Sequence, residues 1–188
     1  MLHPLRQHIE KITPLSDGEF EYVLAHFKPK KVRRHQFLIE ESEPVPHEFF
    51  VVRGCLKAFN TDPSGKVHII QFALEDWWVS DYQAFFNEVP ATVFLSSLED
   101  GELLTITLAD RNKLCAEMHK MEHFFRLKIT ASYIALQQRI LAGMNLSVQE
   151  RYEKLLKLYP NLSQRVPKQD IAAYLGVTRE TLSRLGRS

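Results

Sequence analysis

Cysteine is scarce in this chain, since only Cys55 and Cys115 occur among 188 residues. Two cysteines cannot build the disulfide framework of a small secreted domain. They are also too few for an iron–sulfur cluster that is held by four thiolates of one chain. We therefore expect two reduced, buried thiols, as in a protein of the cytoplasm.

Long apolar runs are missing as well. No stretch approaches the roughly 18–20 apolar residues that a helix needs to cross a bilayer. Residues 1–6 lack the apolar core of a signal peptide. The sequence therefore predicts a cytoplasmic protein that does not act at a membrane.

The chain also has little net charge, +1 at neutral pH, but this charge is unevenly placed. Residues 147–188 hold eight basic and four acidic residues, which leaves +4 on this segment and −3 on the rest. A basic end on a weakly acidic body suits a polyanionic partner such as double-stranded DNA.

A sequence pattern typical of β-strands begins near residue 31 and continues to about residue 107. Short runs rich in β-branched and aromatic residues alternate there with turn residues. The runs are 36–40, 48–53, 56–60, 67–73, 93–98 and 103–108. Asp62-Pro63-Ser64-Gly65 predicts a tight hairpin turn, and Gly54 predicts a turn of positive φ. Many short strands with regular turns favour an antiparallel sandwich or barrel.

Helix signals flank this region. Ser16 with Glu19, and Ser147 with Glu150, have the spacing of capping boxes and predict two helix starts. Asp110 is expected to cap a short helix just after the last strand.

A longer helix is expected over about 119–144, and it has two apolar stripes. The first has the alternating spacing of three and four that marks a coiled-coil seam. Its members, the predicted dimer interface, are Phe124, Leu127, Ala131, Ile134, Gln138 and Leu141. The second stripe is Phe125, Ile129, Tyr133, Leu136, Ile140 and Met144. Two apolar faces need two partners, which we expect to be the β domain and the same helix of a second subunit; burial within one chain is the alternative.

Residues 169–185 have the pattern of a helix-turn-helix. Ala172 is small enough for two helices to cross, and Gly176 suits a left-handed turn between them. The apolar residues that would join the helices are Ile171, Leu175, Val177, Leu182 and Leu185. The second helix would expose Thr178, Arg179, Glu180, Ser183 and Arg184. Such side chains can bind base edges and phosphates, although a helical hairpin with a packing role has the same core pattern.

The segment 178–184, Thr-Arg-Glu-Thr-Leu-Ser-Arg, resembles the recognition helix of the superfamily of cyclic-AMP receptor proteins and fumarate–nitrate regulators, the Crp/Fnr superfamily. Segments 49–54 and 62–66 are similar to a strand with its glycine turn and to a hairpin of that superfamily. The resemblance covers nearly the whole chain. It implies an α+β fold with an N-terminal antiparallel β-roll, a jelly roll like that of cyclic-nucleotide-binding domains, over 1–118. It further implies a dimerisation helix over 119–146 and a helix-turn-helix domain over 147–188.

The resemblance also implies roles for single residues. Arg179, Glu180 and Arg184 would read bases, and Gln169 and Thr178 would contact the DNA backbone. The full predicted DNA-binding set is Lys168, Gln169, Thr178, Arg179, Glu180, Ser183 and Arg184. A homodimer on double-stranded DNA is implied, with RNA polymerase as a further candidate partner. Family members continue into a β-hairpin wing, which this sequence lacks after Leu185, so we expect weaker binding.

Members that bind cyclic nucleotides carry Gly-Glu and, about ten residues later, Arg-Ser or Arg-Thr. The corresponding residues here, a degenerate effector pocket, are Trp78, Ser80, Asp81, Ala91 and Thr92. Asp81 could replace the acid, but Ala91 stands where the cation belongs. A dehydrated phosphate without that cation loses a charge-assisted hydrogen bond worth roughly 1.5–3 kcal/mol. We therefore expect no cyclic AMP binding and no cofactor, with the effector undetermined.

The positions of the histidines bear on two other functions, metal binding and catalysis. His119 and His123 are four residues apart on a helix, a spacing that can hold a metal, but two solvated histidines are the simpler interpretation. His35, His47 and His68 lack the close spacing of a metal enzyme on strands, so no enzyme is expected. A cyclic-nucleotide-binding signalling module with a vestigial DNA-binding hairpin is the main alternative function.

Overall fold

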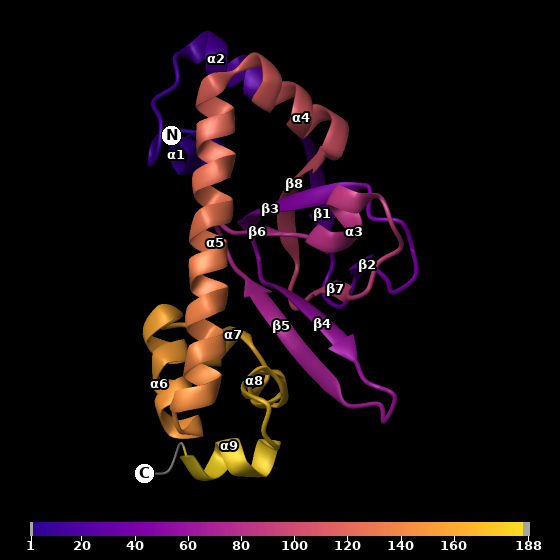
Figure 1. Ribbon diagram of the computed structural model, residues 1–188, viewed down its shortest axis with the longest axis vertical. Coiled ribbons are helices and arrows are strands. Elements are labelled where there is room, and N and C mark those ends of the chain that lie inside the picture. The colour runs from indigo at the N-terminus through magenta and orange to yellow at the C-terminus, as the bar shows by residue number, and fades with distance from the viewer. Residues whose placement is uncertain (1, 186–188) are drawn as a thin grey trace. The chain divides into compact units, whose positions relative to one another are not determined.

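The computed structural model describes residues 2–185 (Figure 1). The chain divides into two compact units. The N-terminal unit runs up to Ala58 and from Phe72 to Lys128, and the C-terminal unit comprises Phe59–Gln71 and the chain from Ile129 onward. One hairpin and one long helix therefore each contribute residues to both units.

Eight strands within residues 2–185 form two antiparallel four-stranded sheets, with orders β1-β8-β3-β6 and β2-β7-β4-β5. The strands are β1 Lys28–Val32, β2 Phe37–Ile39, β3 His47–Arg53, β4 Leu56–Thr61, β5 Val67–Ala73, β6 Trp78–Val79, β7 Phe94–Ser97 and β8 Gly101–Thr107. The predicted antiparallel roll is thereby confirmed. Gly54 has φ of 119°, as expected for the turn between β3 and β4. Strand β6 was not predicted, because two residues are too few to show a repeating pattern.

Nine helices are found between residues 2 and 185. They are α1 Pro4–Glu10, α2 Asp17–Leu24, α3 Tyr82–Asn87, α4 Leu108–Glu117, α5 His119–Asn145, α6 Val148–Leu158, α7 Leu162–Arg165, α8 Lys168–Leu175 and α9 Arg179–Leu185. Both predicted capping boxes are present. The Ser16 hydroxyl accepts from the backbone N–H of Glu19, whose carboxylate accepts from the N–H of Ser16, and Ser147 and Glu150 repeat the arrangement.

The prediction that Asp110 caps α4 is wrong. Thr107 is the N-cap, and its hydroxyl oxygen accepts from the Asp110 backbone N–H at 3.1 Å. Thr107 keeps the extended backbone of β8, which is the conformation that an N-cap needs. Asp110 instead lies in the first turn of α4, where a carboxylate is favoured by the helix dipole.

The core of the N-terminal unit has two parts. One surrounds Trp78 and includes Phe50, Phe124 and the fully buried Leu5 and Ile9 of α1. The other consists of apolar residues from both sheets, with Val51 and Leu56 fully buried. Cys55 is buried and Cys115 is half-buried, and both are thiols.

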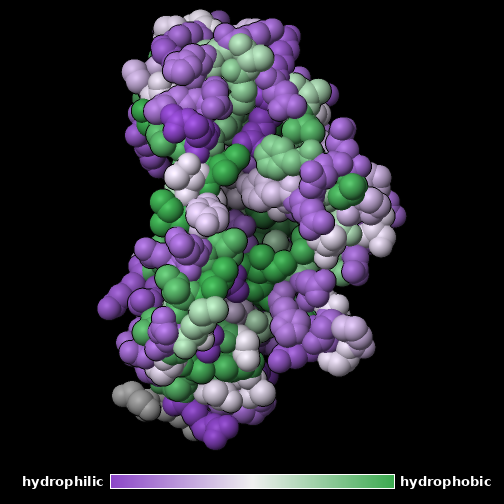
Figure 2. Space-filling model, in the orientation of Figure 1, coloured by the Kyte–Doolittle hydropathy of each residue, from purple (hydrophilic) through white to green (hydrophobic). Residues whose placement is uncertain are grey.

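Helix α5 changes character along its length. Met121, Phe124 and Phe125 are buried within the N-terminal unit. From residue 129 onward its large apolar side chains are 48–74% exposed, and Figure 2 shows apolar colour along the lower half of this helix. They are Ile129, Tyr133, Ile134, Leu136, Ile140, Leu141 and Met144. Among the described residues, no helix is long and apolar enough to cross a membrane.

Candidate nucleic-acid interface

Helices α8 and α9 form the two arms of a helix-turn-helix in the C-terminal unit. Gly176 has φ of 75° and ends α8 in the left-handed conformation predicted for it. The turn is closed by a hydrogen bond from the Val177 N–H to the Ala172 carbonyl at 3.0 Å. The buried residues that join the arms are Ile171, Ala172, Leu175 and Leu182. This packing fixes the direction in which α9 presents its outer face.

Two arginines from other helices bind the carboxyl end of α8. Arg139 of α5 donates to the Tyr174 carbonyl at 3.4 Å, and Arg151 of α6 donates to the Leu175 carbonyl at 3.1 Å. Cations are favoured at a helix carboxyl end, because the last carbonyls lack partners within the helix. Neither contact was predicted from the sequence. The available signal was Arg139 itself, a charged residue within the otherwise uncharged stretch 129–145 of the long helix.

The outer face of α9 gathers four of the seven predicted DNA-binding residues. One open surface pocket of about 440 Å³ is lined by Arg179, Glu180, Ser183 and Arg184. Thr178 is the residue before α9, and its hydroxyl oxygen accepts from the Thr181 N–H at 3.2 Å. Such a cap satisfies one N–H at the start of the helix.

The charged groups on this face are available to a ligand. Among the described residues, no carboxylate lies within ion-pair distance of Arg179 or Arg184. A backbone hydrogen bond and the Thr178 hydroxyl hold the pKa of Glu180 below its usual value, with help from the two arginines. Glu180 is therefore an ionised acceptor at neutral pH. Lys168 and Gln169 are exposed in the first turn of α8 and lie apart from this set in the sequence.

In the predicted effector pocket, the carboxylate of Asp81 is already engaged in hydrogen bonds with neighbouring residues. Asp81 is the buried N-cap of α3, and its carboxylate accepts from the Ala84 N–H at 3.1 Å. The carboxylate also accepts from the N–H and hydroxyl of Thr92, at 2.7 and 3.0 Å. Burial would raise the pKa of Asp81, but these hydrogen bonds outweigh burial and hold the pKa below its usual value. A carboxylate thus occupies the anion-binding end of α3.

The other predicted pocket residues have internal partners too. Ala91 is buried, and its backbone N–H donates to the Glu43 carbonyl at 2.8 Å. The Ser80 hydroxyl donates to the His47 carbonyl at 3.0 Å. Trp78 packs in the core and donates its indole N–H to His8 at 3.2 Å. The structure therefore brings Asp81 and Thr92 together and directs Trp78 elsewhere.

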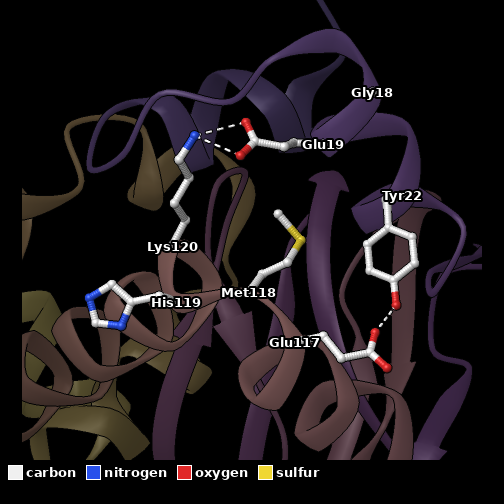
Figure 3. A pocket seen from close by; sticks show the side chains of 7 residues that line it. All are labelled: Gly18, Glu19, Tyr22, Glu117, Met118, His119 and Lys120. Carbon is white, nitrogen blue, oxygen red and sulfur yellow. Dashed lines mark hydrogen bonds and ion pairs between the residues drawn. The ribbon is translucent and has the colours of Figure 1, made fainter.

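A surface pocket of about 460 Å³ lies where α2 meets the junction of α4 and α5 (Figure 3). Lys120 forms an ion pair with Glu19, with Nζ 2.7 Å from Oε1. The Tyr22 hydroxyl donates a hydrogen bond to the carboxylate of Glu117. His119 lies at its rim. Among the residues that the structure describes, no group of three or more potential metal ligands occurs.

Residues 29–118 match the cyclic nucleotide-binding domain, and residues 165–185 match the crp family of bacterial regulatory proteins. The transcriptional regulatory protein btr of Bordetella pertussis is 29% identical over 167 residues, covering 82% of this chain and 68% of btr. The regulatory protein HlyX of Actinobacillus pleuropneumoniae is 26% identical over 172 residues, covering 84% and 70%.

Solved structures share the fold. The c-di-GMP responsive regulator CLP of Xanthomonas campestris superposes with a TM-score of 0.72 at 16% identity, over 92% of this chain and 90% of CLP. FixK2 of Bradyrhizobium japonicum gives 0.74 at 17% identity, over 86% and 83%. The family matches and the two sequence relatives, together with the helix-turn-helix, identify the class as a DNA-binding transcription regulator, which is not an enzyme. The two family matches and the two sequence relatives support membership of the Crp/Fnr superfamily.

Proposed function

We propose that the protein acts as a homodimer that holds two half-sites of double-stranded DNA, each with one α9 in the major groove. The observation that carries the proposal is the exposed apolar surface of α5 from Ile129 to Met144, which includes Ile134 and Leu141 of the predicted dimer seam. Leaving several large apolar side chains in water forfeits roughly 1.5–3 kcal/mol for each that could be buried. A second copy of the helix would cover this face around a two-fold axis.

Within the predicted seam, the residues differ in what they offer to a second subunit. Phe124 is buried in its own N-terminal unit, and Leu127 is half-buried. Ala131, Ile134, Gln138 and Leu141 are exposed. The dimer contact therefore lies mainly in the second half of α5.

On the DNA, Arg179 and Arg184 act as donors to guanine O6 and N7, and Glu180 accepts from cytosine N4. Thr178, Ser183, Lys168 and Gln169 contact phosphates and fix the register of α9 in the groove. A two-fold dimer requires half-sites about 34–36 Å apart, one turn of the duplex. The protein works in the cytoplasm, with RNA polymerase as a candidate partner.

We further propose that cyclic AMP is not the effector of this protein. The carboxylate of Asp81 already takes the N–H groups of Ala84 and Thr92. A cyclic phosphate brought to this place would meet a carboxylate and, at Ala91, no cation. Burying the phosphate where the N–H donors are already taken and no cation is present opposes binding.

The test is selection from a randomised pool of DNA duplexes at fixed salt, read by sequencing, with and without cyclic AMP. A two-fold symmetric site whose half-sites are about 10 base pairs apart is expected, and cyclic AMP should leave its enrichment unchanged. No enriched sequence would contradict base recognition by α9. Enrichment that depends on cyclic AMP would instead support the nucleotide-sensing alternative.

A further inference from the structure

Arg139 of α5 has contacts in two separate segments of the C-terminal unit. Its guanidinium donates to the backbone carbonyls of Ile69, at 3.0 Å, and Ile70, both in the hairpin 59–71. The same group donates to the Tyr174 carbonyl at the end of α8. It also lies over the Tyr174 ring, with Cζ 4.0 Å from the ring centroid.

This pattern needs an arginine. A guanidinium is a planar fork with five N–H donors, so one group can serve acceptors on two sides and stack on a ring at the same time. A lysine ammonium keeps the charge but is a compact point donor without a planar face. Substitution by lysine therefore separates the bridging geometry from the charge.

The hairpin is continuous with strands of the N-terminal unit. β4 begins at Leu56 and β5 ends at Ala73, and both boundary stretches belong to that unit. A shift of these strands would move the carbonyls that Arg139 holds. The other end of the bridge, Tyr174, is two residues before Gly176 of the helix-turn-helix turn.

We propose that Arg139 is a positioning residue that couples the hairpin 59–71 to the helix-turn-helix, so that a shift of β4 and β5 changes the presentation of α9. Because Arg139 contacts both the hairpin 59–71 and the end of α8, a conformational change in the hairpin alters the turn of the helix-turn-helix. In the same way, a ligand that restrains the turn also restrains the hairpin. Coupling between two sites is reciprocal.

Arg151 provides a matched control within the same unit. Its guanidinium donates to the Leu175 carbonyl, one residue beyond the acceptor of Arg139, and no described contact joins it to the hairpin. Loss of Arg151 should loosen the turn alone, whereas loss of Arg139 should loosen the turn and the hairpin together.

The experiment is hydrogen–deuterium exchange of the full chain without DNA, read by mass spectrometry over segments 67–71 and 172–178. Arg139→Lys is expected to speed exchange in both segments, by about tenfold where a hydrogen bond from a charged donor is lost. Arg151→Lys is expected to speed exchange in 172–178 only. Because no DNA is present, the outcome does not depend on the proposed operator binding.

A second measurement uses the DNA enriched from the randomised pool. Operator DNA should slow exchange in 67–71 in the native protein and in Arg151→Lys, but not in Arg139→Lys. Exchange in 67–71 that is the same in native and Arg139→Lys proteins, with and without DNA, would overturn the coupling. Arg139→Gln repeats the comparison without the charge, and circular dichroism verifies that each variant is folded.

Discussion

The guanidinium of Arg111, on α4, lies 3.5 Å from the carboxylate of Glu48, on β3, and the two side chains are only 5% and 4% exposed. Arg111 also lies over the rings of Phe86 and Phe125, at 4.7 and 4.4 Å from their centroids. Burial raises the pKa of Glu48, while the charge of Arg111 and a hydrogen bond from Tyr82 oppose that rise. The pair joins a strand to a helix inside the N-terminal unit.

Removing one partner of this pair should be costly. Arg111→Met leaves a buried carboxylate without its cation, and we expect the free energy of unfolding to fall by about 3–5 kcal/mol. Urea denaturation followed by circular dichroism measures the change. The double variant Glu48→Gln with Arg111→Met should recover much of the loss, because no isolated charge remains. A single variant within about 1 kcal/mol of the native protein would contradict this account.

Because of the buried His8, we expect the free energy of unfolding to fall in mild acid. Burial, and next the charge of Lys128, lower the pKa of His8 from 6.5 to about 4, although Asp76 opposes the shift. Above pH 6.5 the imidazole is neutral in the folded and unfolded states, so it contributes no pH dependence. Between pH 6.5 and 4 only the unfolded chain takes up this proton, so stability falls as the pH falls. Below pH 4 both states are protonated and the loss is complete.

The measurement is the free energy of unfolding at pH 7 and pH 4.5. His8→Gln keeps an acceptor for the Trp78 indole N–H but does not titrate, so its loss between the two pH values should be smaller by about 2–3 kcal/mol. The exposed His119→Gln is the matched control and should retain the native loss. Equal losses in all three proteins would show that His8 is not responsible.

Arg179→Ala tests base reading. We expect about 1–3 kcal/mol weaker binding to the enriched site and relaxed preference at one base position, because a bidentate contact is lost. Competition binding against each single-base variant of the site measures this. Lys168→Ala, exposed at the start of α8, should weaken all sequences alike and reduce the salt dependence. If Arg179→Ala also weakened all sequences alike, Arg179 would be a phosphate contact.

Ile134→Asp tests the dimer. Ile134 is exposed on the second half of α5, so the monomer should stay folded. A charge at the covered seam would be desolvated in both subunits, at a cost of several kcal/mol for each ion. Sedimentation velocity should then show monomers at concentrations where the native chain is dimeric. Val89→Asp, exposed just after α3 and outside the predicted seam, should leave the dimer intact; a native protein that sediments as a monomer would contradict the proposal.

The helix-turn-helix and the hairpin could be predicted from the sequence because their signals are local. The helix-turn-helix predicted over 169–185 agrees with α8 and α9, and the predicted strand 67–73 agrees with β5. Gly176, the serine caps and the Asp62–Gly65 turn each act within a few residues of themselves. Helix α1 was missed, although Pro4 at its first position and the His3 cap offered a signal.

By itself the sequence determined the order of the elements, the turns and caps that bound them, and the residues that α9 carries, since each depends on neighbours along the chain. Only the tertiary structure decided which distant groups meet: Asp81 with Thr92, Glu48 with Arg111, and Arg139 with both the hairpin and α8. Those contacts join residues 11 to 70 positions apart, and no repeating pattern encodes them. They depend on how strands and helices pack once the apolar residues are buried.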